Sequence, residues 1–463
     1  MDLGACVTSL GNGAMDTRNC SKTMNTTSRR AFLKSSAVAV AATTWSGGVP
    51  SVVAAGANER IQLGIIGPGG MGMNLLRSFA PMPDVQVGWV CDPDENRARA
   101  AAREVEDRTG RPPRVVADLR RVLEDNSVDA VIIATPDHWH APATILACDA
   151  GKHVYVEKPA SHNLREGRLM IDAARKAKRV VQVGTQSRSS PHVLRAMELL
   201  KQGVIGDILV AKVWNSQLRR DIGHATPTRP PAELDFDLWL GPAPAVPYRS
   251  NLLHSQWRWF RAFGTGDMGN DGVHDIDIAL WGLGVVSHPN RIVASGGKYF
   301  FDDDQEFPDT QTVIFEYGPP VVGGRPRQLI FEQRIWSPYV QEGHENGNAF
   351  YGTKGYMILG KGGGWQIFGP RNQPGESMKG TVNSQAHHRN FLECLRTGAL
   401  PNADIEIGHL SSSLCHLGNI ATQTGRALTF DPVKERFKGD STATRLLHRQ
   451  YRKGHWAVPV GAS

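Results

Sequence analysis

The sequence predicts an α/β protein in which a doubly wound parallel sheet precedes a second α/β domain with a largely antiparallel open sheet. In the first third of the chain, short apolar runs such as 61–66 and 128–134 alternate with helical patterns, as strands buried on both faces do. A glycine-rich turn joins the first run to the first helical pattern. Later strand-like segments follow one another across Gly/Pro-rich breaks without long helices between them, which is typical of antiparallel pairing.

Composition restricts the class of protein. With 463 residues the chain is long enough for two domains, and 40% hydrophobic and 21% charged residues are ordinary for a soluble globular protein. The net charge is +7, but Lys and Arg occur singly or in short pairs, which argues against nucleic-acid binding. Beyond residue 57 no segment approaches the roughly 20 apolar residues needed to cross a bilayer, so we expect no membrane association after processing.

Residues 1–57 have the layout of an export leader. Ser28–Lys34 reads SRRAFLK, which closely resembles a twin-arginine signal, and a mildly apolar stretch and the small residues Ala55–Ala57 follow it. The sequence therefore predicts delivery to the periplasm or another exported location by the twin-arginine machinery. The alternative is a chance arginine pair in a disordered leader, and this segment is left out of the fold prediction.

The first strand leads into a nucleotide-binding turn. Ile61–Ile66 is the strand, and a Gly-x-Gly-x-x-Gly pattern follows it before a helix through Leu75 and Phe79. Such glycines allow a tight turn and a close approach of the backbone to a pyrophosphate, which then lies at the helix N-terminus. The predicted cofactor-binding residues of this turn are Gly67, Gly69, Gly70, Met71 and Gly72.

The second strand, 85–90, runs into Cys91 and Asp92. An acidic residue about 20 positions after the glycines is the usual partner of a ribose 2′-hydroxyl and disfavours a 2′-phosphate. Asp92 therefore predicts NAD as the cofactor, while the nearby Arg97 and Arg99 keep NADP possible. A turn residue at the end of a strand is the alternative for Asp92.

Two more strand ends carry polar side chains. Residues 134–140 read ATPDHWH, and residues 157–159 read EKP. Ligands of open α/β sheets bind at the carboxyl ends of the strands, where these segments converge. His138 and His140 could suggest a metal, but without a nearby Cys or carboxylate cluster we expect none. The predicted cofactor contacts here are Thr135, Pro136, His138, His140, Glu157 and Lys158.

Together with VYVEKP at 154–159 and VVQVGTQSR at 180–188, these motifs resemble the glucose–fructose oxidoreductase, inositol dehydrogenase and rhizopine-catabolism (Gfo/Idh/MocA) family. The resemblance covers nearly all of residues 60–435 and places Gln186 near the cofactor. It implies a carbohydrate substrate, a sugar or polyol oxidised with NAD or NADP, and a homo-oligomer. After the predicted signal peptide at 1–57, the expected parts are a Rossmann domain at 58–183, a C-terminal α/β domain at 184–435 and a tail at 436–463.

The residues after 190 fit that plan when they are read directly. A basic tail follows residue 435 and can pack on a neighbouring molecule. The expected strands lie at 207–214 and near 291–300, 311–317, 328–336 and 347–368, and the expected helices at 191–202, 384–397 and 407–425.

Residues 264–277 resemble a second signature of the family, in which an Asp stands four residues before a His and another Asp three residues after it. His274 and Asp277 match this signature, but Asn270 occupies the first Asp position and Asp271 is displaced by one. On a regular α-helix the positions 270, 274 and 277 share a face. We therefore expect the Asp271 side chain to point elsewhere.

The resemblance implies hydride transfer from a sugar carbon to nicotinamide, coupled to loss of the hydroxyl proton. The predicted catalytic residues are His274 as general base and Lys158, which stabilises the developing alkoxide. A core histidine and a surface lysine are the alternatives. The aromatic segment 257–259 can stack on a sugar ring, cover the nicotinamide or pack between the domains. The predicted substrate-binding residues are Lys158, Trp259, Asn270 and His274.

Three functions fit these residues. The first is an exported oxidoreductase with a tightly bound, internally recycled cofactor, because the twin-arginine pathway carries folded proteins and no free dinucleotide pool exists outside the cytoplasm. The second is a glycoside hydrolase that uses bound NAD⁺ to oxidise a sugar transiently, eliminate the aglycone, add water and reduce the product. The third is a non-catalytic nucleotide- or sugar-binding protein. The presence of Lys158 and His274 argues against this third function.

Overall fold

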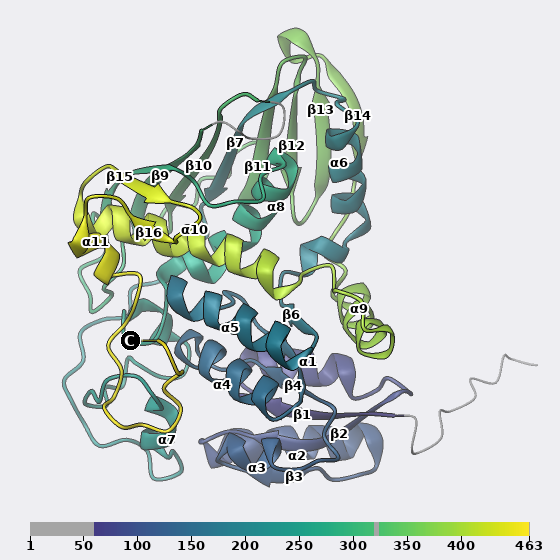
Figure 1. Cartoon of the computed structure of the whole chain (residues 1–463), viewed down its shortest axis with the longest axis vertical. Coiled ribbons are helices and arrows are strands. Elements are labelled where there is room, and N and C mark those ends of the chain that lie inside the picture. Colours follow the sequence, from purple (N-terminus) through teal and green to yellow (C-terminus); the bar gives the residue numbers. More distant parts are fainter. Residues whose placement is uncertain (1–59, 319–323, 463) are drawn as a thin grey trace, which may run out of the picture. The chain divides into compact units, whose positions relative to one another are not determined.

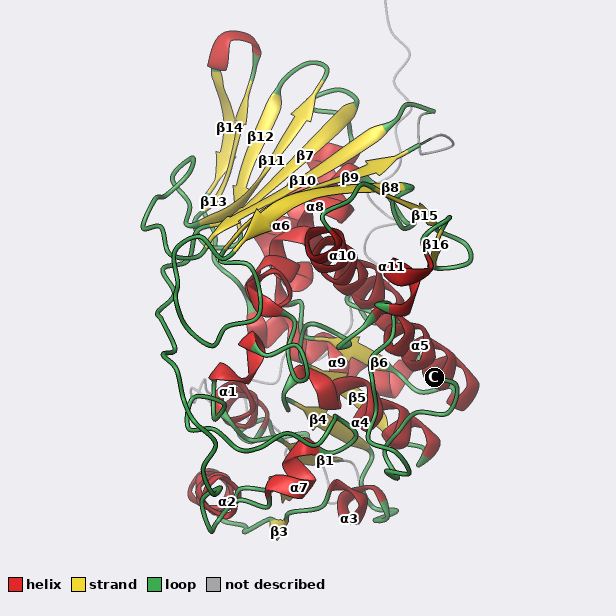
Figure 2. Cartoon of the chain, turned by 90° about the vertical axis from the view of Figure 1, so that its left-hand side faces the viewer, coloured by secondary structure: helices red, strands yellow, loops and turns green. Residues whose placement is uncertain are grey.

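The computed structural model describes residues 60–318 and 324–462, and the predicted leader at 1–57 lies outside them. These described residues belong to one compact unit that contains two sheets (Figures 1 and 2). In these two described ranges, no helix is both long enough and apolar enough to span a membrane.

The first sheet has six parallel strands in the order β3-β2-β1-β4-β5-β6, with helices packed on both faces. The predicted doubly wound sheet is thus confirmed. The direction of strand order reverses between β1 and β4, where open α/β sheets bind ligands. The strands are β1 (Ile61–Ile66), β2 (Val85–Cys91), β3 (Arg114–Val116), β4 (Ala130–Ile133), β5 (His153–Val156) and β6 (Val181–Val183). The helices are α1 (Gly70–Phe79), α2 (Glu95–Thr109), α3 (Leu119–Leu123), α4 (Asp137–Asp149) and α5 (Leu164–Ala177).

Burial and capping explain why these segments form these elements. All four side chains of β4 are fully buried, as expected of a central parallel strand. At the start of α2, the Asp94 carboxylate accepts hydrogen bonds from the backbone of Asn96 and Arg97. Gly110 ends the same helix with a φ of 68°, a left-handed conformation that favours glycine.

The second sheet has ten strands in the order β14-β13-β12-β11-β7-β10-β9-β8-β15-β16. Strands β7 and β10 pair in parallel, and the other described pairs are antiparallel, which confirms the largely antiparallel prediction. The single expected segment at 347–368 is divided into three strands. The strands are β7 (Ile208–Asn215), β8 (Arg291–Gly297), β9 (Thr310–Tyr317), β10 (Arg327–Arg334), β11 (Asn346–Gly352), β12 (Tyr356–Gly360), β13 (Gly364–Phe368), β14 (Pro374–Met378), β15 (Leu428–Asp431) and β16 (Arg436–Phe437).

Helices α6, α8 and α10 pack on one face of this sheet around the buried Phe315, Phe331 and Phe350. Helix α9 instead packs on the first sheet, where Phe391 lies 6.4 Å from Phe79 between ring centroids. The helices of this part are α6 (Pro191–Lys201), α7 (Phe236–Leu240), α8 (Val273–Leu283), α9 (Ser384–Thr397), α10 (Ile405–Thr424) and α11 (Ser441–Arg445). Short helical turns are η2 (Gln186–Ser189), η3 (Gln256–Trp259), η4 (Met268–Gly272) and η5 (Pro370–Asn372).

The tail after β16 packs on the Rossmann domain of its own chain (Figure 1). From the sequence, packing on a neighbouring molecule was expected to be possible. Arg449 pairs with Glu166 of α5 at 2.6 Å, and both side chains are almost fully buried. Trp456 packs against Trp139 of α4, with 5.8 Å between ring centroids. The tail therefore contributes to the same core as the first sheet.

Candidate active site

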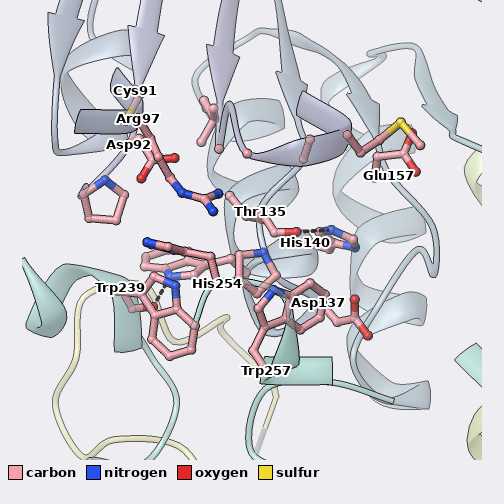
Figure 3. Close-up of a pocket in the computed structure, with 18 of the residues that line it drawn as sticks. Cys91, Asp92, Arg97, Thr135, Asp137, His140, Glu157, Trp239, His254 and Trp257 are labelled. Atoms are coloured by element: carbon pink, nitrogen blue, oxygen red, sulfur yellow. Dashed lines mark hydrogen bonds between the residues drawn. The ribbon is translucent and has the colours of Figure 1, made fainter. Parts of the chain in front are cut away.

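A cavity of about 470 Å³ lies at the carboxyl ends of β1, β2, β4 and β5 (Figure 3). Its walls come from the first sheet, from residues 254–270 of the second domain and from the tail. The structure brings together at this cavity the predicted residues Gly67, Gly69, Gly70, Met71, Asp92, Thr135, Pro136, His140, Glu157, Lys158 and Asn270. The predicted residues that do not line it are Gly72, His138, Gln186, Trp259 and His274.

The glycine-rich turn fits a dinucleotide. Gly67 has a φ of 78°, and a Cβ on it would lie 2.8 Å from the backbone nitrogen of Thr135. A Cβ on Gly72 would overlap the carbonyl oxygen of Gly67, so this glycine allows α1 to pack closely on the turn. The Thr135 hydroxyl is buried and has no partner among the described residues. A close backbone approach, a helix N-terminus and a free hydroxyl match the needs of a pyrophosphate and its riboses.

Asp92 and Arg97 line the end of the cavity next to β2 (Figure 3). Burial raises the pKa of Asp92 to about 7, even though the backbone N–H of Asp94 donates to its carboxylate at 2.9 Å. This carboxylate at the end of β2 has the place of a ribose-binding acid in a Rossmann domain.

Lys158 lies at the opposite end, because it follows β5, and β1 and β4 separate β5 from β2. Its Nζ donates a hydrogen bond to the carbonyl oxygen of Asn270. Burial lowers the pKa of Lys158, although Glu157 and Asp271 act to raise it. Burial raises the pKa of Glu157 to about 7. Gln186 donates to Glu157 at 3.3 Å and so supports the cavity wall from behind.

The two histidines after β4 contact backbone carbonyls. His140 faces the carbonyl oxygens of Pro159 at 2.7 Å and Thr135 at 2.9 Å with its two ring nitrogens. His138 is fully buried, and its Nε2 lies 3.0 Å from the carbonyl oxygen of Trp239. Burial lowers the pKa of both imidazoles, and that of His138 falls to about 3. Their positions hold the turn after β4 in place.

The aromatic segment before the second signature divides between the cavity and the core. Trp257 lines the cavity. Trp259 is 4% exposed and packs in a cluster with Trp239 and Phe263, so its position matches the packing alternative. The ring available to a ligand in this segment is therefore that of Trp257.

The second signature departs from a regular helix. Met268–Gly272 form a π-helical turn directly before α8, and such a turn holds one extra residue. The Asp271 carboxylate accepts hydrogen bonds from Gln217, Asn346 and, at 3.0 Å, Lys361. Asn270 lines the cavity and Asp271 does not, so the expectation that the Asp271 side chain points elsewhere is not contradicted, although the turn is π-helical.

Asp271, Lys158 and His274 interact electrostatically. Burial alone would raise the pKa of Asp271, but Lys361, His274 and Lys158 lower it to about 2, so this carboxylate is ionised. His274 is half-buried, beside the residues that line the cavity. Burial, Lys361 and Lys158 lower its pKa well below the usual value, so its imidazole is neutral at neutral pH.

Asn270 has a structural reason to replace an aspartate. Its Nδ2 donates to Asp267 at 2.9 Å, and Asp267 pairs with Arg219 at the same distance. A carboxylate at position 270 would face the buried carboxylate of Asp267 and repel it. The amide removes this repulsion, and Asp271 supplies the negative charge next to Lys158.

Three contributors were not found from the sequence. Lys361 follows β12 and binds Asp271. Trp239 lies within α7, and Trp456 belongs to the tail. The Arg120 guanidinium lies 4.2 Å from the ring centroid of Trp456. These residues carry no local motif, and contacts over long distances in the sequence bring Trp239 and Trp456 to the cavity and Lys361 to Asp271.

Family models match two parts of the chain. Residues 61–185 match the NAD-binding Rossmann fold of an oxidoreductase family, and 213–294 with 374–458 match the C-terminal alpha/beta domain of that oxidoreductase family. Together the matches cover more than half of the chain, and residues that line the cavity belong to both matched domains.

Similar proteins include a glycosyl hydrolase family 109 protein from Saccharopolyspora erythraea, 33% identical over 162 residues, or 34% of this chain and 35% of that protein. A levoglucosan dehydrogenase from Pseudarthrobacter phenanthrenivorans is 27% identical over 250 residues, 51% of this chain and 55% of that protein. The matches span about one to two thirds of the curated relatives.

The fold is also that of a solved structure. The WlbA dehydrogenase from Bordetella pertussis, in complex with NADH and UDP-GlcNAcA, gives a TM-score of 0.60 at 20% identity over 80% of this chain and 99% of that one. The family matches, the two sheets and the cavity at the glycine-rich turn agree with one another. The chain belongs to the Gfo/Idh/MocA family of NAD-binding oxidoreductases.

Proposed function

We propose that this protein is an exported oxidoreductase that acts on a sugar or polyol with a tightly bound, internally recycled NAD. The observation that carries the proposal is that Lys158, which lines the end of the cavity away from Asp92, interacts electrostatically with Asp271 and His274. Dehydrogenation must remove the proton of a hydroxyl, and a half-buried ammonium that interacts with a neutral imidazole and an ionised carboxylate is suited to that task.

Each residue has a defined part in this chemistry. Bound NAD⁺ would supply the hydride acceptor, held at the glycine-rich turn and Asp92. Lys158 donates a hydrogen bond to the reacting hydroxyl oxygen and stabilises its developing negative charge. The neutral His274 accepts the proton, and the ionised Asp271 stabilises the imidazolium that forms. The carbonyl oxygen of Asn270 positions the Lys158 ammonium.

Retention of the cofactor is supported by the way the cavity is built. Trp456 forms part of its wall, and the buried Arg449–Glu166 pair anchors the tail that carries this ring. The SRRAFLK motif at 28–34 supports export of the folded protein, and outside the cytoplasm a released dinucleotide would not be replaced. We therefore propose a catalytic cycle in which a second, carbonyl-bearing molecule reoxidises the same cofactor. A homo-oligomer is part of this proposal by analogy with the family.

The test is the nucleotide content and turnover of the protein purified without added cofactor. One NAD or NADH per chain, reduced once by a sugar and reoxidised by a carbonyl acceptor, is the expected result. Lys158→Ala should lower turnover by about 10²–10⁴-fold with unchanged nucleotide content. Lys152→Ala is the control, because Lys152 donates to the Asp125 carbonyl oxygen outside the cavity. Full turnover of Lys158→Ala would refute the catalytic assignment.

A second candidate is the NAD-dependent glycoside hydrolase, favoured by the similarity to the glycosyl hydrolase family 109 protein. Such a reaction uses the same oxidation and reduction, with elimination of the aglycone between them. The purified protein should then cleave aryl glycosides without net formation of NADH. Cleavage of that kind would replace the first proposal, whereas oxidation of free sugars without cleavage would remove the second.

A further inference from the structure

Arg258 of η3 lines the cavity without a partner. Within 60–318 and 324–462, no hydrogen bond or ion pair reaches its guanidinium, and its buried Nε has no acceptor. Its contact is with the ring of Trp257, 5.3 Å from the centroid. Burial lowers the pKa of Arg258, as expected of a cation that has lost water without gaining a carboxylate.

Arg258 is half-buried, and two arginines that are more fully buried have carboxylate partners. Arg188 pairs with Asp277 at 2.7 Å, and Arg449 pairs with Glu166 at 2.6 Å. Burial of a charged group is costly unless it is paired and hydrogen-bonded. Arg258 departs from this rule at a place where a ligand can enter, so its missing partner is an anion from outside the chain.

No carboxylate near Arg258 is available to it. Three of them act on its pKa, and each has a closer partner. The pairs are Asp267 with Arg219 at 2.9 Å, Asp271 with Lys361 at 3.0 Å and Asp137 with Thr265 at 2.7 Å. Small movements of the chain would therefore break an existing pair in order to satisfy Arg258.

Arg258 belongs to the substrate end of the cavity. Its charge acts on Lys158, and the carboxylate Asp271 acts on both. The glycine-rich turn and Asp92, which fit the phosphates and a ribose of the cofactor, lie on the β1 and β2 side. Figure 3 shows Trp257, the residue before Arg258, beside Asp137 and away from Asp92.

We propose that Arg258 binds a carboxylate of the substrate and that the substrate is a sugar acid. The planar guanidinium can hold a carboxylate through two parallel hydrogen bonds, which fixes the orientation of the sugar. Lys158 then meets the hydroxyl that is oxidised, and Trp257 is placed to cover the ring. This assignment rests on the proposed oxidoreductase site and adds the class of its substrate.

The test is calorimetric binding to the cofactor-loaded protein of a panel of uronic and aldonic acids, the corresponding neutral sugars, and sugar phosphates. The tightest acid should bind about tenfold or more tightly than its neutral counterpart. Arg258→Gln should remove this difference and leave the neutral sugars unchanged, and Arg258→Lys should retain part of it. Arg261→Gln is a matched control in the same segment, because Arg261 donates to Gln423 at 2.8 Å outside the cavity.

Several results would overturn the assignment. One is equal binding of acids and neutral sugars by the unchanged protein, and another is tighter binding of sugar phosphates than of carboxylates. Loss of bound nucleotide in Arg258→Gln would assign the arginine to the cofactor. Acid binding that depends on Arg258 without oxidation of any sugar would support the carboxylate site and refute the proposed oxidoreductase, so the two proposals fail separately.

Discussion

At the scale of single residues, the charge of each site carboxyl is set by the balance of burial and nearby cations. Burial raises the pKa of Asp92 and Glu157 to about 7. Asp271 is also removed from water, yet Lys361 and its neighbours lower its pKa to about 2. The site thus places an ionised carboxylate where it acts on Lys158, the proposed catalytic lysine, and two titratable carboxyls along the cavity.

Asp92 makes cofactor selection depend on pH. Its carboxyl is neutral below a pKa of about 7 and charged above it. The charged form accepts a ribose hydroxyl more strongly and repels a 2′-phosphate. We expect the preference for NAD over NADP, measured by calorimetry on nucleotide-free protein, to increase several-fold between about pH 6 and pH 8. Asp92→Asn should remove this change, and an unaltered pH dependence in that variant would contradict the prediction.

Asp271 should be required for turnover, and its place in the π-helical turn should matter. Asp271→Asn removes the charge beside His274 with little change of shape, and we expect kcat/KM to fall about a hundredfold. The double variant Asn270→Asp with Asp271→Asn moves the carboxylate to the family's usual spacing. It should not recover activity and should lower the Tm, because residue 270 faces Asp267. Recovered activity would show that the register of the π-helical turn is unimportant.

At the scale of elements, the tail is expected to retain the nucleotide without taking part in the reaction itself. Trp456→Ala removes an aromatic wall of the cavity. Loss of an aromatic ring stacked on a base weakens binding measurably, so we expect the bound nucleotide to dissociate about tenfold faster in dialysis or competition experiments. Trp456→Phe should keep nucleotide dissociation nearly as slow as in the unchanged protein. Val460→Ala, at a position 95% exposed, should leave the dissociation rate unchanged. An unchanged rate in Trp456→Ala would contradict the retention role.

At the scale of the whole molecule, the predicted leader would decide in which compartment the proposed reaction takes place. Replacing both Arg29 and Arg30 by lysine should keep the protein in the cytoplasm, because the twin-arginine receptor reads that pair. Cell fractionation followed by immunoblotting measures this. The retained protein should still carry one nucleotide per chain. Export of the double-lysine variant would refute the assigned route.

Local patterns predicted the parts of the fold that local physics determines. Apolar runs, the turn at 67–72 and the alternation of strands and helices indicated both sheets. The π-helical turn was missed, because the partners of Asp271 are remote in the sequence: Gln217 follows β7, and Asn346 lies in β11. Trp456 was missed for the same reason, since its position depends on a core formed with α4.

The residues that form the cofactor end of the cavity are synthesised before the tail residues that form its last wall. Every described strand is synthesised before Arg449 and Trp456, so the nucleotide turn, Asp92 and Lys158 can assemble while the tail wall is still absent. We expect NAD to enter from the cytosol most easily before the Arg449–Glu166 pair has formed and the tail completes the wall. The order of synthesis would then favour binding of the cofactor in the cytosol before the proposed export of the finished protein.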